Sequence, residues 1–173
     1  NTLANGDVIT CVVTSNLPCA SPTTATSTGI TMTVTGPFTY TWTGTTSTDW
    51  ATATNWNPNG IPTSTDNIII PTTANKPMLP ANQTIANMNL TGTNKVILGN
   101  NTLCVNAITG GSSSSYVVTN GTGSLIIKAL PTNVATTFPI GASETSYDPL
   151  SIRPTNSVDF TAKVKATTIA GDF

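Results

Sequence analysis

Short apolar runs separated by Gly, Asn, Pro and Ser recur along most of the chain, and no helical period lasts beyond one turn. The runs lie at residues 68–70, 85–90, 96–98, 103–105, 116–118 and 125–127. Runs this short, rich in β-branched residues and bounded by turn-forming residues, predict strands. Their spacing of about 7–13 residues suits a β-sandwich or the successive faces of an irregular β-helix. We therefore expect an all-β fold, with both arrangements open for residues 66–130.

The two ends of the chain have patterns of their own. Residues 7–13 and 28–35 predict strands, and the second segment alternates strictly between apolar residues and threonine. A Gly-Pro break then separates residues 1–36 from residues 37–173. Two strands are too few for an independent fold. We expect residues 1–36 to be the closing strand pair of an immunoglobulin-like sandwich, ordered by docking on the rest of the chain or on another copy.

The C-terminal segment changes texture again after Pro131. Residues 158–165 alternate between apolar and polar positions, with lysines on the polar side. This pattern predicts a half-buried antiparallel strand. We expect it to begin a sandwich-like portion that continues past Phe173, so the β-rich segment 37–173 is expected to be incomplete at its C-terminal end.

Composition narrows the possible functions. Charged residues make up 8% of the chain, threonine about a fifth, and histidine is absent. An ordinary globular domain carries about 25% charged residues, and histidine is the usual general base near neutral pH. The six basic residues are scattered, whereas binding of nucleic acid needs several on one face. No apolar stretch approaches the ~20 residues of a membrane span. We expect no enzyme, no nucleic-acid partner and no membrane span.

Three cysteines are present, and two of them lie close in sequence. Cys11 and Cys19 flank a turn-rich segment, so we predict a disulfide that closes this loop in an oxidising compartment; two free thiols are the alternative. Cys104 lies in an apolar run and is expected to behave as a small core residue. Without histidine, the three cysteines do not form a zinc pattern.

All three tryptophans, Trp42, Trp50 and Trp56, fall within one short stretch near two acids, Asp49 and Asp66. The indoles are expected either to cap the β-core or to stack on sugars. Each aspartate is expected to cap a turn. A weak calcium site is the alternative, although calcium takes six to eight oxygen ligands. No other cofactor is expected, and the dispersed acids do not predict the carboxylate pair of a glycosidase.

Several segments resemble large secreted surface proteins of Bacteroidetes. They are Trp42-Thr-Gly-Thr-Thr-Ser-Thr-Asp-Trp50, Asn55-Trp-Asn-Pro-Asn-Gly-Ile-Pro62, Asp66-Asn-Ile-Ile-Ile-Pro71, Leu98-Gly-Asn-Asn-Thr-Leu103, Ser115-Tyr-Val-Val-Thr-Asn-Gly-Thr-Gly-Ser-Leu125 and Phe138-Pro-Ile-Gly141. Residues 3–34 resemble the end of an immunoglobulin-like (PKD-like) repeat. The resemblance implies type IX secretion, an extracellular or cell-surface address and a multidomain parent. It implies no catalytic residues.

These observations together predict a function. We expect a non-catalytic structural or adhesive module of a secreted cell-surface protein: a stalk, an adhesin, or a fibre or surface-layer subunit. The alternative is a carbohydrate-binding module. The expected partners are other domains of the parent protein, other copies joined by strand pairing, and surface glycans.

Overall fold

The computed structural model describes residues 6–34 and 36–165, and its regular structure is almost entirely β. The one helical element in this part of the chain is a single 3-10 turn, Ala53–Asn55. The all-β prediction is therefore confirmed. No helix of the described residues is long and apolar enough to cross a membrane. The chain divides into two compact units, residues 1–36 and residues 37–173.

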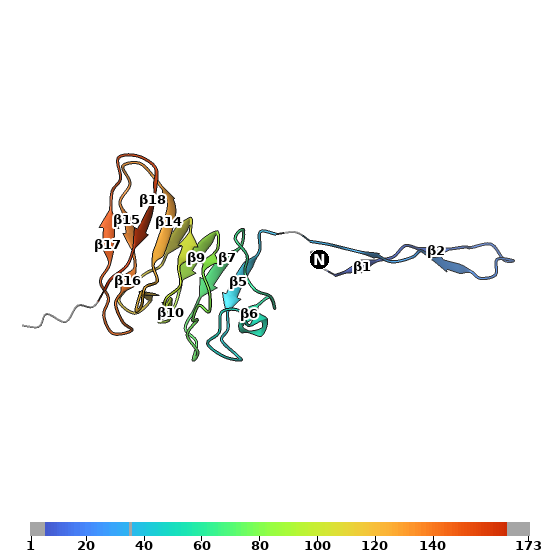
Figure 1. Ribbon diagram of the computed structural model, residues 1–173. Coiled ribbons are helices and arrows are strands. Elements are labelled where there is room, and N and C mark those ends of the chain that lie inside the picture. The colour runs from blue at the N-terminus through green and yellow to red at the C-terminus, as the bar shows by residue number, and fades with distance from the viewer. Residues whose placement is uncertain (1–5, 35, 166–173) are drawn as a thin grey trace, which may run out of the picture. The chain divides into compact units, whose positions relative to one another are not determined.

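The N-terminal unit is a narrow antiparallel ribbon (Figure 1). Strand β1 (Val8–Ile9) pairs with β4 (Ile30–Thr31), and β2 (Val12–Thr14) pairs with β3 (Thr24–Thr26). All four strands are exposed along their whole length. The ribbon therefore has no core of its own, which agrees with the limited stability expected of a single hairpin in water.

The second unit contains three sheets built mainly from parallel strands (Figure 1). The first sheet has the order β12 (Ala107–Thr109), β9 (Asn87–Leu90), β7 (Asn67–Ile70), β5 (Thr39–Trp42), β6 (Trp56–Asn57), with β6 antiparallel. The second sheet has the order β10 (Lys95–Ile97), β13 (Tyr116–Val118), β16 (Ile140–Gly141). The third sheet has the order β18 (Val158–Ala162), β14 (Leu125–Leu130), β11 (Leu103–Val105), β8 (Gln83–Thr84), with β18 antiparallel.

The chain visits the three sheets in turn, so that these strands form a β-solenoid of about four turns over residues 67–141. The register gives the repeat length: Asn67 lies beside Asn87, and Asn87 lies beside Ala107, 20 residues on. Of the two arrangements open for residues 66–130, the structure is the β-helix. The sandwich is wrong here because neighbouring strands are parallel and belong to successive turns.

Alternation along each strand builds the core. In β7, Ile68 and Ile70 are buried while Asn67 and Ile69 between them are partly exposed. The same alternation in β11 buries Leu103 and Val105 and leaves Cys104 partly exposed. Cys104 is therefore not the core residue that the sequence predicted. A side chain alternates faces with each residue of a strand, so its inward neighbours fix its outward direction.

Asparagine and threonine at the corners connect one turn of the solenoid to the next. The N–H of Thr102 donates to Oδ1 of Asn82 over 2.8 Å, and the N–H of Thr122 donates to Oδ1 of Asn100 over 3.1 Å. The amide of Asn101 likewise donates to the carbonyl oxygen of Leu79 over 2.7 Å. Stacked loops satisfy main-chain groups that a corner would otherwise leave unpaired. This use explains much of the Asn- and Thr-rich composition.

Antiparallel strands follow the last complete turn. Strand β18 covers the outer edge of β14, and β15 (Thr136–Phe138) pairs with β17 (Leu150–Ile152). The rings of Phe138 and Phe160 pack edge to face with centroids 5.7 Å apart. The half-buried antiparallel strand predicted near residues 158–165 is therefore present, and it ends at Ala162.

Candidate functional site

The tryptophans lie in the core at the β5–β6 end of the solenoid. Trp42 and Trp50 are 0% exposed and Trp56 is 2% exposed. Trp56 lies between the other two, with ring centroids 5.0 Å from Trp42 and 4.8 Å from Trp50, each in an edge-to-face arrangement. Of the two functions open for these residues, the structure has the core cap. No indole face is available to stack on a sugar.

A buried amide organises the loop that carries Trp50. Asn55 is 0% exposed, and its Oδ1 accepts the N–H groups of Thr46 and Ser47 over 2.9 and 3.0 Å. Its Nδ2 donates to Oγ of Ser47 over 3.0 Å and to the carbonyl oxygen of Asp49 over 2.8 Å. The side chain is fully hydrogen-bonded, as a buried polar group must be. Asn55 is a structural residue, and the sequence analysis gave it no such role.

The two aspartates that were candidate calcium ligands cap separate turns. Asp49 accepts the N–H of Ala51 over 3.0 Å and the hydroxyl of Thr52 over 2.9 Å. Asp66 accepts the N–H of Phe38 through Oδ1, and both the N–H and the hydroxyl of Thr63 through Oδ2, all within 2.8 Å. These donors use the carboxylate oxygens that a cation would need. The calcium reading is therefore not supported, and the capping reading describes both residues.

Burial and hydrogen bonding act against each other at Asp66. Burial raises the pKa of the carboxyl group, but hydrogen bonds from the Thr63 hydroxyl and from the N–H groups of Phe38 and Thr63 lower it further. The net pKa of Asp66 lies below its ordinary value. The carboxylate is therefore ionised at neutral pH, where it fixes the entry of the chain into β7.

The predicted disulfide is absent. Cys11 and Cys19 are free and exposed thiols. The N–H of Cys11 donates to Oγ of Ser27 over 2.9 Å, and its carbonyl oxygen accepts the N–H of Ser27 over 2.8 Å. Ser27 thus occupies the position opposite Cys11. Strand β2 continues to Thr14 before the turn begins, which carries Cys19 towards the ribbon tip.

The outer face of the first sheet is uncharged and open. We call it the Asn/Thr face and define it by two rows of outward side chains. The rows are Thr39, Asn67, Asn87, Ala107 and Thr41, Ile69, Asn89, Thr109. Nδ2 of Asn87 donates to Oδ1 of Asn67 over 2.7 Å across adjacent turns. A shallow hollow of about 360 Å³ lies along this face. Sequence reasoning missed the Asn/Thr face because it arises only when turns 20 residues apart are stacked.

The outer face of the second sheet is covered. Tyr116 and Val118 are buried there with Ile97, and Tyr147 from the loop after β16 packs on them. Nζ of Lys95 lies 5.1 Å from the centre of the Tyr116 ring. Burial raises the pKa of the Tyr116 phenol, and the carboxylates of Glu144 and Asp148 raise it further. This surface is therefore closed by the chain itself.

Ionisable groups are dispersed over the solenoid. In the part of the chain that the structure describes, no three His, Cys, Asp or Glu side chains lie close enough together to hold a metal ion. The Asn/Thr face contributes amide and hydroxyl groups with fixed spacing, and these are groups that bind uncharged polar molecules. Its chemistry is that of a binding or packing surface.

Comparison with known proteins gives a family and no named relative. The model of a domain of unknown function (DUF8693) matches residues 41–144. The match begins within β5 and ends just after β16, so it covers the tryptophan cap and the solenoid turns. No curated protein and no solved structure matches the chain.

Proposed function

We propose that the chain, which belongs to the DUF8693 family of unknown function, is a non-catalytic structural or adhesive module of an extracellular surface protein. The solenoid is the observation that supports this proposal. Its turns share one continuous core that runs from the tryptophans to Phe138 and Ile140. Stacked repeats that contact only their neighbours form extended, regular surfaces, which suit a stalk or an adhesive unit.

Hydrogen bonds between turns support the same role. Main-chain ladders in three sheets and side-chain bonds at the corners join each turn to the next. Few of these interactions depend on charge, since the described part of the chain has one salt bridge, between Lys76 and Glu144. Stability that does not rest on exposed ion pairs changes little with salt. A module exposed outside a cell benefits from this independence.

Protease treatment of intact cells tests the extracellular address. An antibody against the chain should detect it on untreated cells, and brief external proteolysis should remove the signal while a cytosolic marker stays intact. Beads coated with the chain should adhere to cells or to one another more than beads coated with an unrelated β-solenoid. Protection from external protease would overturn the proposed location, and equal adhesion of the two bead types would overturn the adhesive role.

The Asn/Thr face favours a second candidate function, recognition of a neutral glycan. The face is flat, lacks charged side chains and presents amides and hydroxyls on rungs about 4.8 Å apart. A glycan array with the wild-type chain tests this candidate. Asn87→Arg introduces a charge at the centre of the face and should abolish binding. Asn59→Arg, an exposed position outside the face, should retain it. An array without signal would overturn the glycan function.

A further inference from the structure

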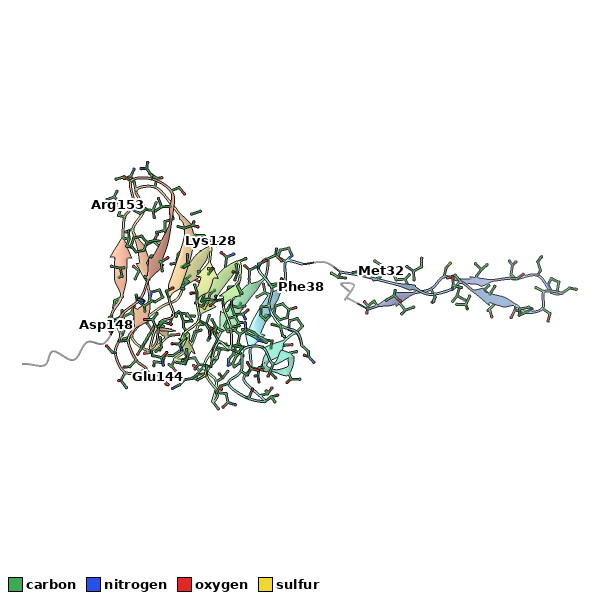
Figure 2. The ribbon with its side chains drawn as sticks, in the orientation of Figure 1. Met32, Phe38, Lys128, Glu144, Asp148 and Arg153 are labelled. Carbon is green, nitrogen blue, oxygen red and sulfur yellow. The ribbon has the colours of Figure 1, made fainter. Side chains whose placement is uncertain are left out.

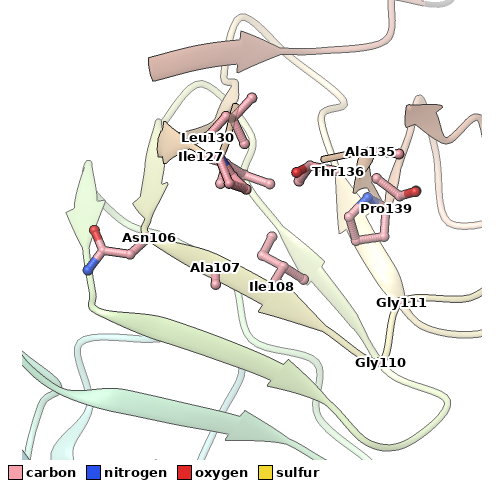
Figure 3. Close-up of a pocket in the computed structure, with 12 residues that line it drawn as sticks. Asn106, Ala107, Ile108, Gly110, Gly111, Ile127, Leu130, Ala135, Thr136 and Pro139 are labelled. Atoms are coloured by element: carbon pink, nitrogen blue, oxygen red, sulfur yellow. The ribbon is translucent and has the colours of Figure 1, made fainter. Parts of the chain in front are cut away.

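An open hollow lies next to the last strand of the first sheet. The hollow, which we call the β12 slot, has a volume of about 440 Å³ (Figure 3). Strand β12 forms one wall with Ala107 and Ile108, and Thr137 and Pro139 lie on the opposite side. Ile127 of β14 also lines it. Strand β12 is the outermost strand of its sheet, and no described strand pairs with its outer edge.

The slot lies where the solenoid would place one more strand. The second sheet continues from β13 to β16, so the segment between β14 and β16 should add a parallel strand to β12. The chain does form a strand there, β15, but β15 pairs with β17 in the antiparallel sense. The outer edge of β12 is thereby left uncovered. The first sheet ends one strand short of the second, and the slot occupies the vacant position.

The β12 edge lacks the features that usually prevent strand addition. Residues 106–111 contain neither charge nor proline. The opposite edge of the same sheet, β6, is two residues long and is followed by Pro58. Strand β18, the edge of the third sheet, carries Asp159. Short strands, prolines and charges are the normal means of blocking an edge, and β12 has none of these except its short length.

The same chain contains an extended apolar segment without a core. In the N-terminal ribbon, Val8 is 62% exposed, Val12 59% and Ile30 68%. The described part of the ribbon carries a single charged residue, Asp7. Around β4, apolar Ile30 and Met32 alternate with threonine, which is the pattern of a strand with one face buried. Insertion of this segment would bring no charge into the uncharged slot.

We propose that the β12 slot of one copy accepts the β4 segment of a second copy as an added strand. The added strand would extend the first sheet and place Ile30 beside Ile108 and Ile127. Donor and acceptor surfaces differ, so the contact is head to tail and can continue from copy to copy. Main-chain pairing would supply affinity and the apolar positions would supply register. This inference deepens the proposed structural role by naming the partner and the contact surface.

Two single-charge variants of the full chain test the contact. Thr137→Lys places a charge at an exposed position that lines the slot, and Ile30→Lys places one on the exposed face of the donor segment. Light scattering after size exclusion should show wild-type masses that rise with concentration to several copies. Each variant alone should be a monomer. Val134→Lys and Leu17→Lys change exposed residues outside the slot and the donor segment, and both should assemble as the wild type does.

Mixing the two variants gives the decisive result. Thr137→Lys retains an intact donor segment and Ile30→Lys retains an intact slot, so an equimolar mixture should form dimers and nothing larger. A wild type that stays monomeric at every concentration would overturn the inference, as would assembly that survives either substitution. A mixture that contains only monomers would also overturn it. Surface exposure is measured separately by protease treatment of cells, so failure of strand exchange and failure of the proposed location are distinguishable.

Discussion

The indole N–H of Trp56 donates to the main-chain carbonyl oxygen of Trp50 over 2.8 Å. The indole nitrogen of Trp50 is itself buried without a hydrogen-bond partner among the described residues. The two rings pack edge to face with centroids 4.8 Å apart. The cap therefore contains one tryptophan whose N–H is satisfied and one whose N–H is not, with similar burial. Figure 2 shows the dense side-chain packing of the solenoid to which this cap belongs.

This asymmetry predicts different costs for the same substitution. Trp56→Phe leaves the Trp50 carbonyl oxygen without its donor, whereas Trp50→Phe breaks no hydrogen bond. We expect Trp56→Phe to lower the free energy of unfolding by about 1–3 kcal/mol more than Trp50→Phe, which is the cost of a buried unsatisfied group. Urea unfolding of both variants measures the difference. Equal costs would show that ring volume alone determines the contribution of each indole.

The Asn55 amide predicts a destabilisation that acid relieves. In Asn55→Asp, an ionised oxygen would face the carbonyl oxygen of Asp49, to which the wild-type Nδ2 donates over 2.8 Å. Burial and this repulsion should raise the pKa of the new carboxyl group. We expect a loss of about 3 kcal/mol or more at neutral pH, since an unpaired charge would be buried. Protonation restores a donor, so the deficit relative to wild type should shrink as the pH falls. Melting temperatures of both proteins across pH test this, and a constant deficit would contradict it.

Asp66 predicts the opposite dependence on pH. Its folded-state pKa is lowered by hydrogen bonds, so it contributes stability above its unfolded pKa of about 3.9. That contribution is lost as the pH falls through the folded pKa. The wild type should therefore lose stability below about pH 4, and Asp66→Asn should show a smaller loss over the same range. Thermal unfolding between neutral and acidic pH measures both curves. Parallel curves would mean that Asp66 does not contribute to the acid sensitivity.

The sequence predicted the strands better than their arrangement. Runs such as Leu103–Val105 and Tyr116–Val118 are strands as expected. The repeat was hidden because inward positions conserve apolar character and not identity: Ile68 lies beside Met88. Corner loops also differ in length, so Leu103 pairs with Leu125, 22 residues on, while Asn67 pairs with Asn87, 20 residues on. A spacing of about 20 between the Asn-Ile and Asn-Met runs was the available signal.

The site residues divide in the same way. Local chemistry predicted that aspartates next to Thr would cap turns, and that clustered tryptophans would cap a core. The disulfide failed because sequence spacing does not fix where a hairpin turns, and Ser27 lies opposite Cys11. The β12 slot was beyond reach, since it depends on β15 pairing with β17 and not with β12. Long-range pairing choices of this kind are not encoded in the local pattern.

The two free thiols in the ribbon predict a labelling result. Cys11 and Cys19 are both exposed, and Cys104 is partly exposed. Alkylation of the native protein without reductant should modify Cys11 and Cys19 quickly and Cys104 more slowly, because the reaction needs solvent access. Intact mass and peptide mapping give the order. Absence of label at both ribbon cysteines until reductant is added would show that they are joined in solution.

A matched pair of glycines separates backbone strain from steric conflict. Gly110 follows β12 with φ +77°, and an added Cβ would lie 2.1 Å from the carbonyl oxygen of Leu90 in the neighbouring turn. Gly99 has φ +57°, and an added Cβ there would meet nothing within 4 Å. Both alanine variants bear the cost of a left-handed backbone, about 1–2 kcal/mol. Gly110→Ala must also push two turns of the solenoid apart.

We therefore expect Gly99→Ala to unfold cooperatively with a loss of about 1–2 kcal/mol, and Gly110→Ala to lose clearly more. The larger loss should come with local loosening of β12, because the displaced atom is main chain and cannot rotate away. Hydrogen exchange of the amides in β9 and β12 provides the second readout beside urea unfolding. Equal stability of the two variants would show that β12 can shift outwards without cost, and would contradict the close stacking of turns at this edge.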